Sequence, residues 1–356
     1  MSDNSSGSNQ SRKRSSQKAR SNGRVSGATG QPSSGDRDVF QVLALHGGGI
    51  HGVATAAYLA DLEEYSESHI RDHFDLLVGT STGGIIALAL SLGIPAREVE
   101  TLYRENGEEI FRRRVPFVPT GMAKYLWAPY DQEPLCELLR ETLGPETRLK
   151  DAECRLCIPA VNITTGRNEV FKTPHRDIYT RDPEVKMWRV GAATAAAPPY
   201  FSPVKIPDRG WYVDGGLWAN APIEVGIAEG RKIGHSLDEV EVLSVGTGQE
   251  EYSREGGPHW LFQNGRHGVI GWGSSLVDLV MRSQSQRSQN LGHYLLSDDR
   301  VVHVDFPLPS DIGGLDAVGE VDVLADRARS KAKQNGSAVR DQFFVSEASP
   351  TEANQS

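Results

Sequence analysis

The chain has 356 residues, of which 38% are hydrophobic and 24% charged, as in a globular protein with a sizeable buried core. The net charge of −9 speaks against a protein that binds nucleic acid, and no apolar run approaches the ~20 residues of a membrane-spanning helix. Three cysteines exclude a disulfide scaffold and favour a reducing compartment. Since no secretory signal is visible, we expect a cytoplasmic protein.

Residues 1–37 are rich in Ser, Gly, Asn, Gln, Arg and Lys and contain almost no apolar side chains. Such a segment buries too little surface to offset its ordering entropy, so a disordered basic tail is predicted. Its charge suits anionic lipid headgroups or nucleic acid. The simpler interpretation is an inert, solubilising tail.

The first folded unit is a strand over 39–45, a glycine-rich loop over 46–52 and a helix over 53–64. Bare backbone N–H groups and the positive end of the helix dipole create a cradle for an anion. It would serve either phosphate binding in a nucleotide fold or an oxyanion hole for acyl transfer. The region ~20 residues further on lacks the acidic strand end of a dinucleotide fold, which favours the second alternative.

A second strand, turn and helix follow about 30 residues later, with Ser81 at the apex. The apolar run 74–78 ends at Gly79, and Gly83 precedes a helix that continues through 85–90. This is the G-x-S-x-G pattern of a nucleophile elbow, in which the glycines permit a tight turn. Because parallel strands joined by a helix end at the same sheet edge, the loop and Ser81 are expected to meet.

The remaining chain alternates helices and strands. We predict helices over 96–106, 132–143, 185–193, 223–232, 271–296 and 320–334, and strands over 156–164, 168–172, 211–213, 240–245 and 301–304. The irregular segment 115–130, rich in apolar and aromatic residues, is either a lid at the substrate rim or a loop packed on its own domain. The alternation over 40–250 predicts a three-layer α/β domain.

A serine hydroxyl is a poor nucleophile until a base takes its proton. Asp214 ends a strand, as the elbow does, and Gly215 and Gly216 hold it at a tight turn. It can therefore lie beside Ser81 and act as that base. Since Asp-Gly is also a common turn dipeptide, a purely structural role is the alternative.

Taken together, the motifs at 47–52, 79–83 and 214–216 resemble the three signatures of patatin-like phospholipases, in the same order. Supporting pieces match at 195–201, at Asn220 and Pro222, and at 244–248. The resemblance covers residues 40–250. It implies an α/β fold of three layers, with a mostly parallel central sheet flanked by helices. It also implies a serine acyl hydrolase that cleaves acyl esters of glycerophospholipids through a Ser-Asp dyad and an acyl-enzyme.

Carried onto this chain, the resemblance makes Ser81 the nucleophile and Asp214 the general base. The oxyanion hole would be the loop backbone of Gly47, Gly48, Gly49, Ile50, His51 and Gly52. The motif-supporting residues are Gly79, Gly83, Gly215 and Gly216. The family loop usually opens with Asp and carries Arg before its last glycine, where this chain has His46 and His51. His51 either supplies charge when protonated, which makes activity pH-dependent, or is only a loop side chain.

Two other classes of function are weighed against this one. An α/β-hydrolase esterase with a Ser-His-acid triad would need a late histidine, such as His293 or His303. A non-catalytic protein would keep the loop as an anion site. Cys154-x-x-Cys157 has no second pair, so buried thiols are favoured over a metal or redox site, and no cofactor is expected.

The architecture also resembles bacterial patatin-like effectors of antiviral defence, which cyclic nucleotides activate and which degrade the cell's own membrane. That resemblance implies a phospholipid membrane surface and a cyclic nucleotide activator as partners, no specific nucleic acid, and a peripheral place at the inner membrane surface when active. The oligomeric state stays open, with a homodimer as one alternative. The expected domains are a tail (1–37), the phospholipase domain (38–250), a helical C-terminal extension packed on it (251–345) and a flexible tail (346–356).

Overall fold

The computed structural model describes residues 39–112, 128–250, 275–308, 312, 314–345 and 347–348. The predicted basic tail at 1–37, most of the aromatic segment 115–130, and nearly all of the C-terminal tail lie outside the described residues. Residues 271–274, at the start of one predicted helix, lie outside them too. Among the described residues, no helix combines the length and apolar character needed to cross a membrane.

A mixed sheet forms the middle layer, with described strands in the order β5-β6-β3-β2-β1-β7-β9 and β4 added to β3. Its strands are β1 (Phe40–Leu45), β2 (Leu76–Gly79), β3 (Leu156–Asn162), β4 (Arg167–Lys172), β5 (Val204–Ile206), β6 (Gly210–Asp214), β7 (Val240–Val245) and β9 (Val301–Val304). The pairs along β3-β2-β1-β7-β9 are parallel, whereas β4, β5 and β6 pair antiparallel. Two short strands, β8 (Gln249–Glu250) and β10 (Pro307–Leu308), pair with each other.

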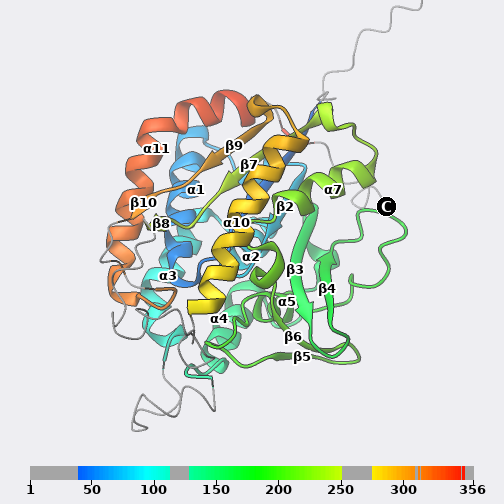
Figure 1. Cartoon of the computed structure of the whole chain (residues 1–356), viewed down its shortest axis with the longest axis vertical. Helices are drawn as coiled ribbons and strands as arrows, with labels where there is room; N and C mark the ends of the chain where they lie inside the picture. The colour runs from blue at the N-terminus through cyan, green and yellow to red at the C-terminus, as the bar shows by residue number, and fades with distance from the viewer. Residues whose placement is uncertain are drawn as a thin grey trace, which may run out of the picture. The chain divides into compact units, whose positions relative to one another are not determined.

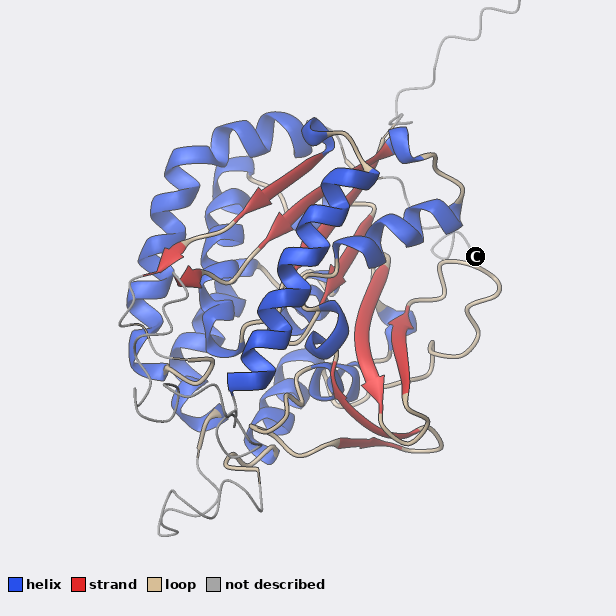
Figure 2. Cartoon of the chain, viewed as in Figure 1, coloured by secondary structure: helices blue, strands red, loops and turns tan. Residues whose placement is uncertain are grey.

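Helices cover both faces of this sheet (Figure 1; Figure 2). They are α1 (Gly52–Ser66), α2 (Thr82–Ser91), α3 (Ala96–Ile110), α4 (Glu133–Leu143), α5 (Met187–Thr194), α6 (Gly216–Ala219), α7 (Ile223–Ile233), α10 (Ser275–Leu295) and α11 (Val321–Phe343). Leu43 and Leu45 of β1 belong to the core with α1 and α2, while Val42 and Ala44 join α7 in a second core. Successive side chains of a strand point to opposite faces of the sheet, and helices cover both faces at β1. Every residue of β1 is therefore buried.

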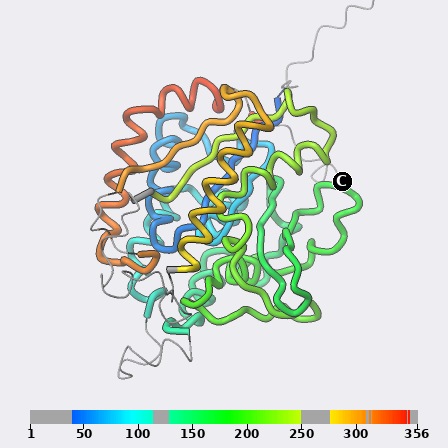
Figure 3. Tube along the Cα trace, in the orientation of Figure 1, coloured from blue at the N-terminus to red at the C-terminus, as the bar shows by residue number. Residues whose placement is uncertain are grey.

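The predicted three-layer fold with a mostly parallel sheet is confirmed, and each predicted helix and strand has a counterpart within the described residues. Four short elements among the described strands and α-helices, β5, α6, β8 and β10, were not predicted. The helix predicted to end at 334 continues to Phe343, because small and apolar residues along it, including Ala332, Gly336 and Val339, are buried and it packs against α1. Figure 3 traces α11 along α1, although the two are distant in sequence.

The described part of the C-terminal region is integrated with the sheet. β9 pairs in parallel with β7, with Val245 opposite Val304. α11 lies on the same face as α1. The expected division of the chain near residue 250 stays a prediction.

Candidate active site

Ser81 lies between the last residue of β2 and the first residue of α2, in a strained conformation. Its φ of 56° and ψ of −126° fall outside the regions that non-glycine residues favour. Such strain costs about 1–3 kcal/mol and persists only where the surroundings enforce it. Here the Ser81 N–H donates to Thr194 Oγ1 at 3.0 Å, and the Thr194 hydroxyl donates to the Pro159 carbonyl at 2.6 Å.

The glycines on either side of Ser81 are required by packing. A Cβ atom on Gly83 would lie 2.4 Å from the Leu45 carbonyl oxygen, and one on Gly79 would lie 2.1 Å from that of Gly83. The two arms of the elbow therefore approach as closely as backbone allows. This closeness lets the serine project at the carboxyl edge of the parallel strands, where Leu45 and Gly79 are register partners.

Thr194→Val should weaken the elbow, since it keeps the side-chain shape but removes the acceptor for the Ser81 N–H. We expect the free energy of unfolding to fall by about 1–3 kcal/mol, the usual cost of an unsatisfied buried polar group. Urea denaturation would measure it, with Thr194→Ser, which retains the hydroxyl, as the matched control. A valine variant as stable as the serine variant would contradict this account.

Asp214 is the last residue of β6, and it is 1% exposed. Its Oδ1 accepts the Gly216 N–H at 2.6 Å, whereas its Oδ2 has no hydrogen-bond partner among the described residues. Burial raises the pKa of Asp214 to about 7, against the opposing effects of the Gly216 N–H and the Ser81 hydroxyl. The Ser81 hydroxyl thus acts on the charged form of this carboxyl.

The glycine-rich loop also meets Ser81. A Cβ on Gly47 would lie 3.1 Å from the Ser81 Cβ, and Gly49, with a φ of +58°, lines the same cavity as Ser81. Four of the six N–H groups from 47 to 52 are already used within the fold. Gly47 donates to Asn220 O, Ile50 to Leu315 O, His51 to Gly48 O, and Gly52 to Gly49 O and Ile50 O. Among the described residues, only the N–H groups of Gly48 and Gly49 in this loop have no acceptor, so these two are the loop donors that remain for a ligand.

Two residues without a predicted role fasten this loop. Asn220 donates from Nδ2 to the Gly47 carbonyl at 3.3 Å, and the Thr247 hydroxyl donates to the same oxygen at 3.3 Å. Both residues stand in the accessory motifs of the sequence, which was the available signal. Thr194, beside the Ala195–Pro198 run, gave no signal of its own.

The two loop histidines occupy different positions. His46 is buried, with Nε2 2.7 Å from Ser244 Oγ, and burial together with His303 lowers the pKa of His46 to about 3 against the effect of Asp305. It is therefore neutral and supplies no charge to the loop. His51 is buried too, but it lines a neighbouring polar cavity and not the one at Ser81.

Among the described residues, no histidine is placed to complete a Ser-His-acid triad at Ser81. The cavity at Ser81 is lined by no histidine among the described residues. His303 lies 3.1 Å from Ser244 Oγ and 3.0 Å from the Gln289 amide nitrogen, and His293 lies 3.4 Å from Asp298. The carboxylate of Asp214 is the base that the described geometry offers.

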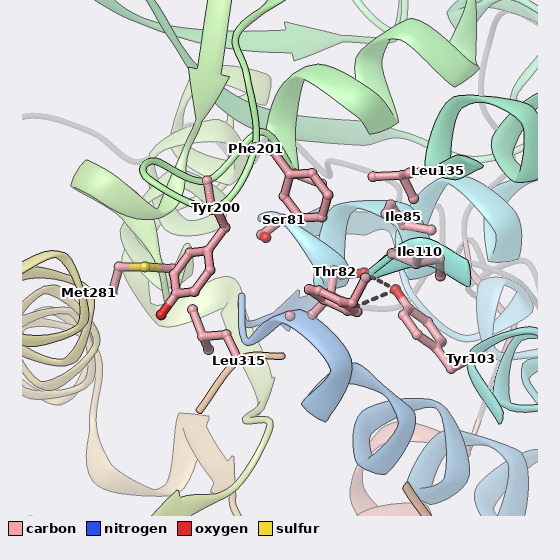
Figure 4. A pocket seen from close by; sticks show the side chains of 14 residues that line it. Ser81, Thr82, Ile85, Tyr103, Ile110, Leu135, Tyr200, Phe201, Met281 and Leu315 are labelled. Carbon is pink, nitrogen blue, oxygen red and sulfur yellow. Dashed lines mark hydrogen bonds between the residues drawn. The ribbon is translucent and has the colours of Figure 1, made fainter. Parts of the chain in front are cut away.

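The cavity above Ser81 is apolar. It measures about 40 Å³, and the Ser81 hydroxyl points into the space near Tyr200 and Phe201 (Figure 4). Met281 and Leu315 lie beside Tyr200 in the same view. A second apolar cavity of about 30 Å³ shares several lining residues with the first, and lies among α2, α3 and α4. The shared residues are Ile85, Tyr103, Ile110 and Leu135.

One group of described residues has the composition of a metal site, away from Ser81. Atoms of Cys157, His175 and Glu229 lie within 4.8 Å of one another. However, Glu229 already pairs with Lys172 and accepts hydrogen bonds from the Tyr179 hydroxyl and His175. These partners lower the pKa of Glu229 to about 2 despite its burial. The cluster is thus satisfied by a lysine cation, and all three cysteines of the chain are free and buried.

Comparison with known proteins agrees with this geometry. Residues 43–227 match the family model described as patatin-like phospholipase. The chain is 35% identical to the cGAMP-activated phospholipase of Escherichia coli (strain TW11681), over 88% of this chain and 95% of that one. It is 36% identical to the proteins of the same name from Pseudomonas aeruginosa, over 86% and 90% of the two chains, and from Vibrio cholerae, over 70% and 76%.

Proposed function

Because the chain belongs to the patatin-like phospholipase family, we propose that Ser81 is the nucleophile and Asp214 the general base of its phospholipase reaction. The observation that carries the proposal is the pairing of a strained serine with a buried carboxyl whose pKa is about 7. A base is most effective when its pKa lies near the working pH. No histidine is required.

The proposed reaction has two stages. Asp214 Oδ2 accepts the Ser81 proton while the serine oxygen attacks the ester carbonyl carbon. The N–H groups of Gly48 and Gly49 stabilise the negative oxygen, a contribution of a few kcal/mol. Collapse of this intermediate expels the lysophospholipid alcohol, which takes the proton from Asp214, and leaves an acyl-serine. Asp214 then accepts a proton from water while the water oxygen attacks the acyl carbonyl carbon. Collapse of the second intermediate breaks the bond to the Ser81 oxygen, releases the fatty acid and returns the proton from Asp214 to Ser81.

The surroundings of Ser81 favour an acyl substrate. The cavity at Ser81 and its neighbour are lined by aliphatic and aromatic side chains, and with volumes of about 40 and 30 Å³ they suit the first methylene groups of an acyl chain. Helices α2, α3 and α4 would contact that part of the chain. The polar part of the substrate would face away from them.

We also propose that cGAMP activates this protein. Three of its relatives are named cGAMP-activated phospholipases. A phospholipase inside the cell needs restraint, and an activator provides it. The proposed setting is the cytoplasmic side of the membrane during antiviral defence, with the enzyme bound peripherally when active.

Lipid mass spectrometry tests the proposed activity. The full chain is incubated with mixed phospholipid vesicles, with and without cGAMP. Free fatty acids and lysophospholipids should accumulate, faster with cGAMP. If neither product forms in either condition, the proposed activity is wrong.

The pH profile should follow the ionisation of Asp214, whose pKa is raised to about 7. The base must be deprotonated, so the rate should fall about tenfold for each pH unit below 7 and level off above it. Initial rates on a soluble ester between pH 5 and 9 measure this, with far-UV circular dichroism at each pH as the control for folding. A rate that stays level down to pH 5 would exclude Asp214 as a base with this pKa.

A further inference from the structure

A second, larger cavity lies beside the loop that carries Gly48, and the proposed reaction does not use it. It has a volume of about 730 Å³. The loop residues Gly47 and Gly48 and the turn at Thr247 and Gly248 line one part of it, and α10 lines another. The polar residues that α10 contributes are Asp278, Arg282, Ser283, Ser285, Gln286 and Gln289.

The cavity is lined by amide, carboxylate and guanidinium groups. Amide side chains come from Asn220, Gln286 and Gln289, carboxylates from Asp278 and Asp305, and a guanidinium from Arg282. Amides pair with the donor and acceptor edges of purines, and carboxylates accept from the amino groups of bases. Arginine binds phosphate. With two carboxylates and one guanidinium, the cavity disfavours binding of a simple anion. The same groups suit a ligand that carries both bases and phosphates.

One buried atom also lacks a partner in this cavity. Asn220 is 7% exposed, and its Oδ1 has no hydrogen-bond donor among the described residues. A buried acceptor without a donor costs free energy, which a ligand N–H would recover. The volume lies within the ~300–1,000 Å³ range of small-molecule sites.

The cavity is connected to the catalytic residues through shared walls. Met281 and Leu315 line both this cavity and the one at Ser81. The Met281 methyl group lies against Gly216, whose N–H holds Asp214 Oδ1. Asn220 donates from Nδ2 to Ser285 Oγ on α10 at 2.9 Å and also contacts the Gly47 carbonyl. A ligand that repositions α10 would therefore affect the position of both Asp214 and the glycine-rich loop.

We infer that this cavity is the binding site of the activating cyclic dinucleotide, with α10 as the element that transmits binding to Asp214. The inference rests on the proposed function, since it locates the activator of that same active site. The amides and carboxylates read the bases, and Arg282 contacts a phosphate.

Isothermal titration calorimetry of the full chain with cGAMP tests the site without relying on turnover. Gln286→Ala combined with Arg282→Ala should raise Kd at least about tenfold, the effect of losing one or two hydrogen bonds. Ser283→Trp, which fills the cavity from the exposed side of α10, should do the same. Asn290→Ala, an exposed amide on α10 that does not line the cavity, is the matched control and should bind as the wild type does.

Activation of vesicle hydrolysis is measured in parallel. The concentration of cGAMP for half-maximal activation should rise in proportion to Kd, whereas for Asn290→Ala it should stay at the wild-type value. Wild-type chain that binds no cGAMP, or cavity variants that bind it as tightly as Asn290→Ala, would overturn the inference. Cavity variants that raise only KM for phospholipid would assign the cavity to the headgroup instead. Binding without any hydrolysis would count against the proposed function and leave this site standing.

Discussion

Ser81→Ala should lower phospholipid hydrolysis by at least about 10³-fold while cGAMP binding stays unchanged. The loss is large because, in the proposed reaction, the Ser81 oxygen forms the covalent acyl-enzyme. Hydroxyl groups nearby do not offer a substitute, since that of Thr82 is held by Tyr103 and that of Thr194 by Pro159. Fatty-acid release from vesicles is the measurement.

Ser81→Gly is the matched partner of this variant. It removes the same oxygen, but glycine adopts a φ of 56° without strain. Both variants should be inactive, and the glycine variant should be more stable than the alanine variant by about 1–2 kcal/mol. Alanine and glycine variants that hydrolyse vesicles at the wild-type rate would remove Ser81 from the mechanism. Equal stability of the two would show that the backbone at the elbow is not strained.

The position of the site could be predicted from the sequence because it depends on strand ends. Ser81 and the glycine loop each follow a strand of the same parallel sheet, so their meeting follows from topology. Asp214 also ends a strand, but β6 runs antiparallel to β3, so the strand-end argument does not place it. Asp214 reaches this edge because it pairs with Ala160, near the carboxyl end of β3. Topology therefore predicts that the loop meets Ser81, whereas the register of β6 brings Asp214 to them.

The supports of the site could not be predicted in the same way. Thr194, Asn220 and Thr247 act through hydrogen bonds to backbone atoms far away in the sequence. Such bonds depend on register and side-chain direction, which periodicity does not reveal. The same holds for the glycine-rich loop. The Leu315 carbonyl accepts a hydrogen bond from the Ile50 N–H, although the two residues are far apart in the sequence.

His46 stands where the family loop usually has Asp, and only the structure shows which contacts the histidine makes there. Its ring stacks on that of His303, with the ring centroids 5.3 Å apart, and hydrogen-bonds to the Ser244 hydroxyl. With a pKa of about 3 it contributes no charge. The role left for it is to support the loop through neutral hydrogen bonding.

Asp214→Asn should abolish hydrolysis and stabilise the fold at the same time. Asparagine keeps the shape and the acceptor for the Gly216 N–H, but it cannot take the Ser81 proton, so a loss of at least about 10³-fold in rate is expected. The stabilisation arises because burial raises the pKa of Asp214 from 3.8 to about 7. The folded state thus holds a proton that the unfolded state has released between these two values, and the stability of the wild type falls as pH rises through that window.

The difference in stability between the wild type and Asp214→Asn should depend on pH, and its disappearance at low pH is an internal control. Above pH 7 the wild type bears the full cost of a buried charge, on the order of 4 kcal/mol for a shift of this size, and the asparagine variant bears none. Below pH 4 both side chains are neutral, so the two proteins should be about equally stable. Urea denaturation at pH 8 and at pH 4 measures the difference. A gain that does not depend on pH would show that Asp214 is not held in a costly ionised state, and the case for this carboxylate as a base poised near neutrality would be lost with it.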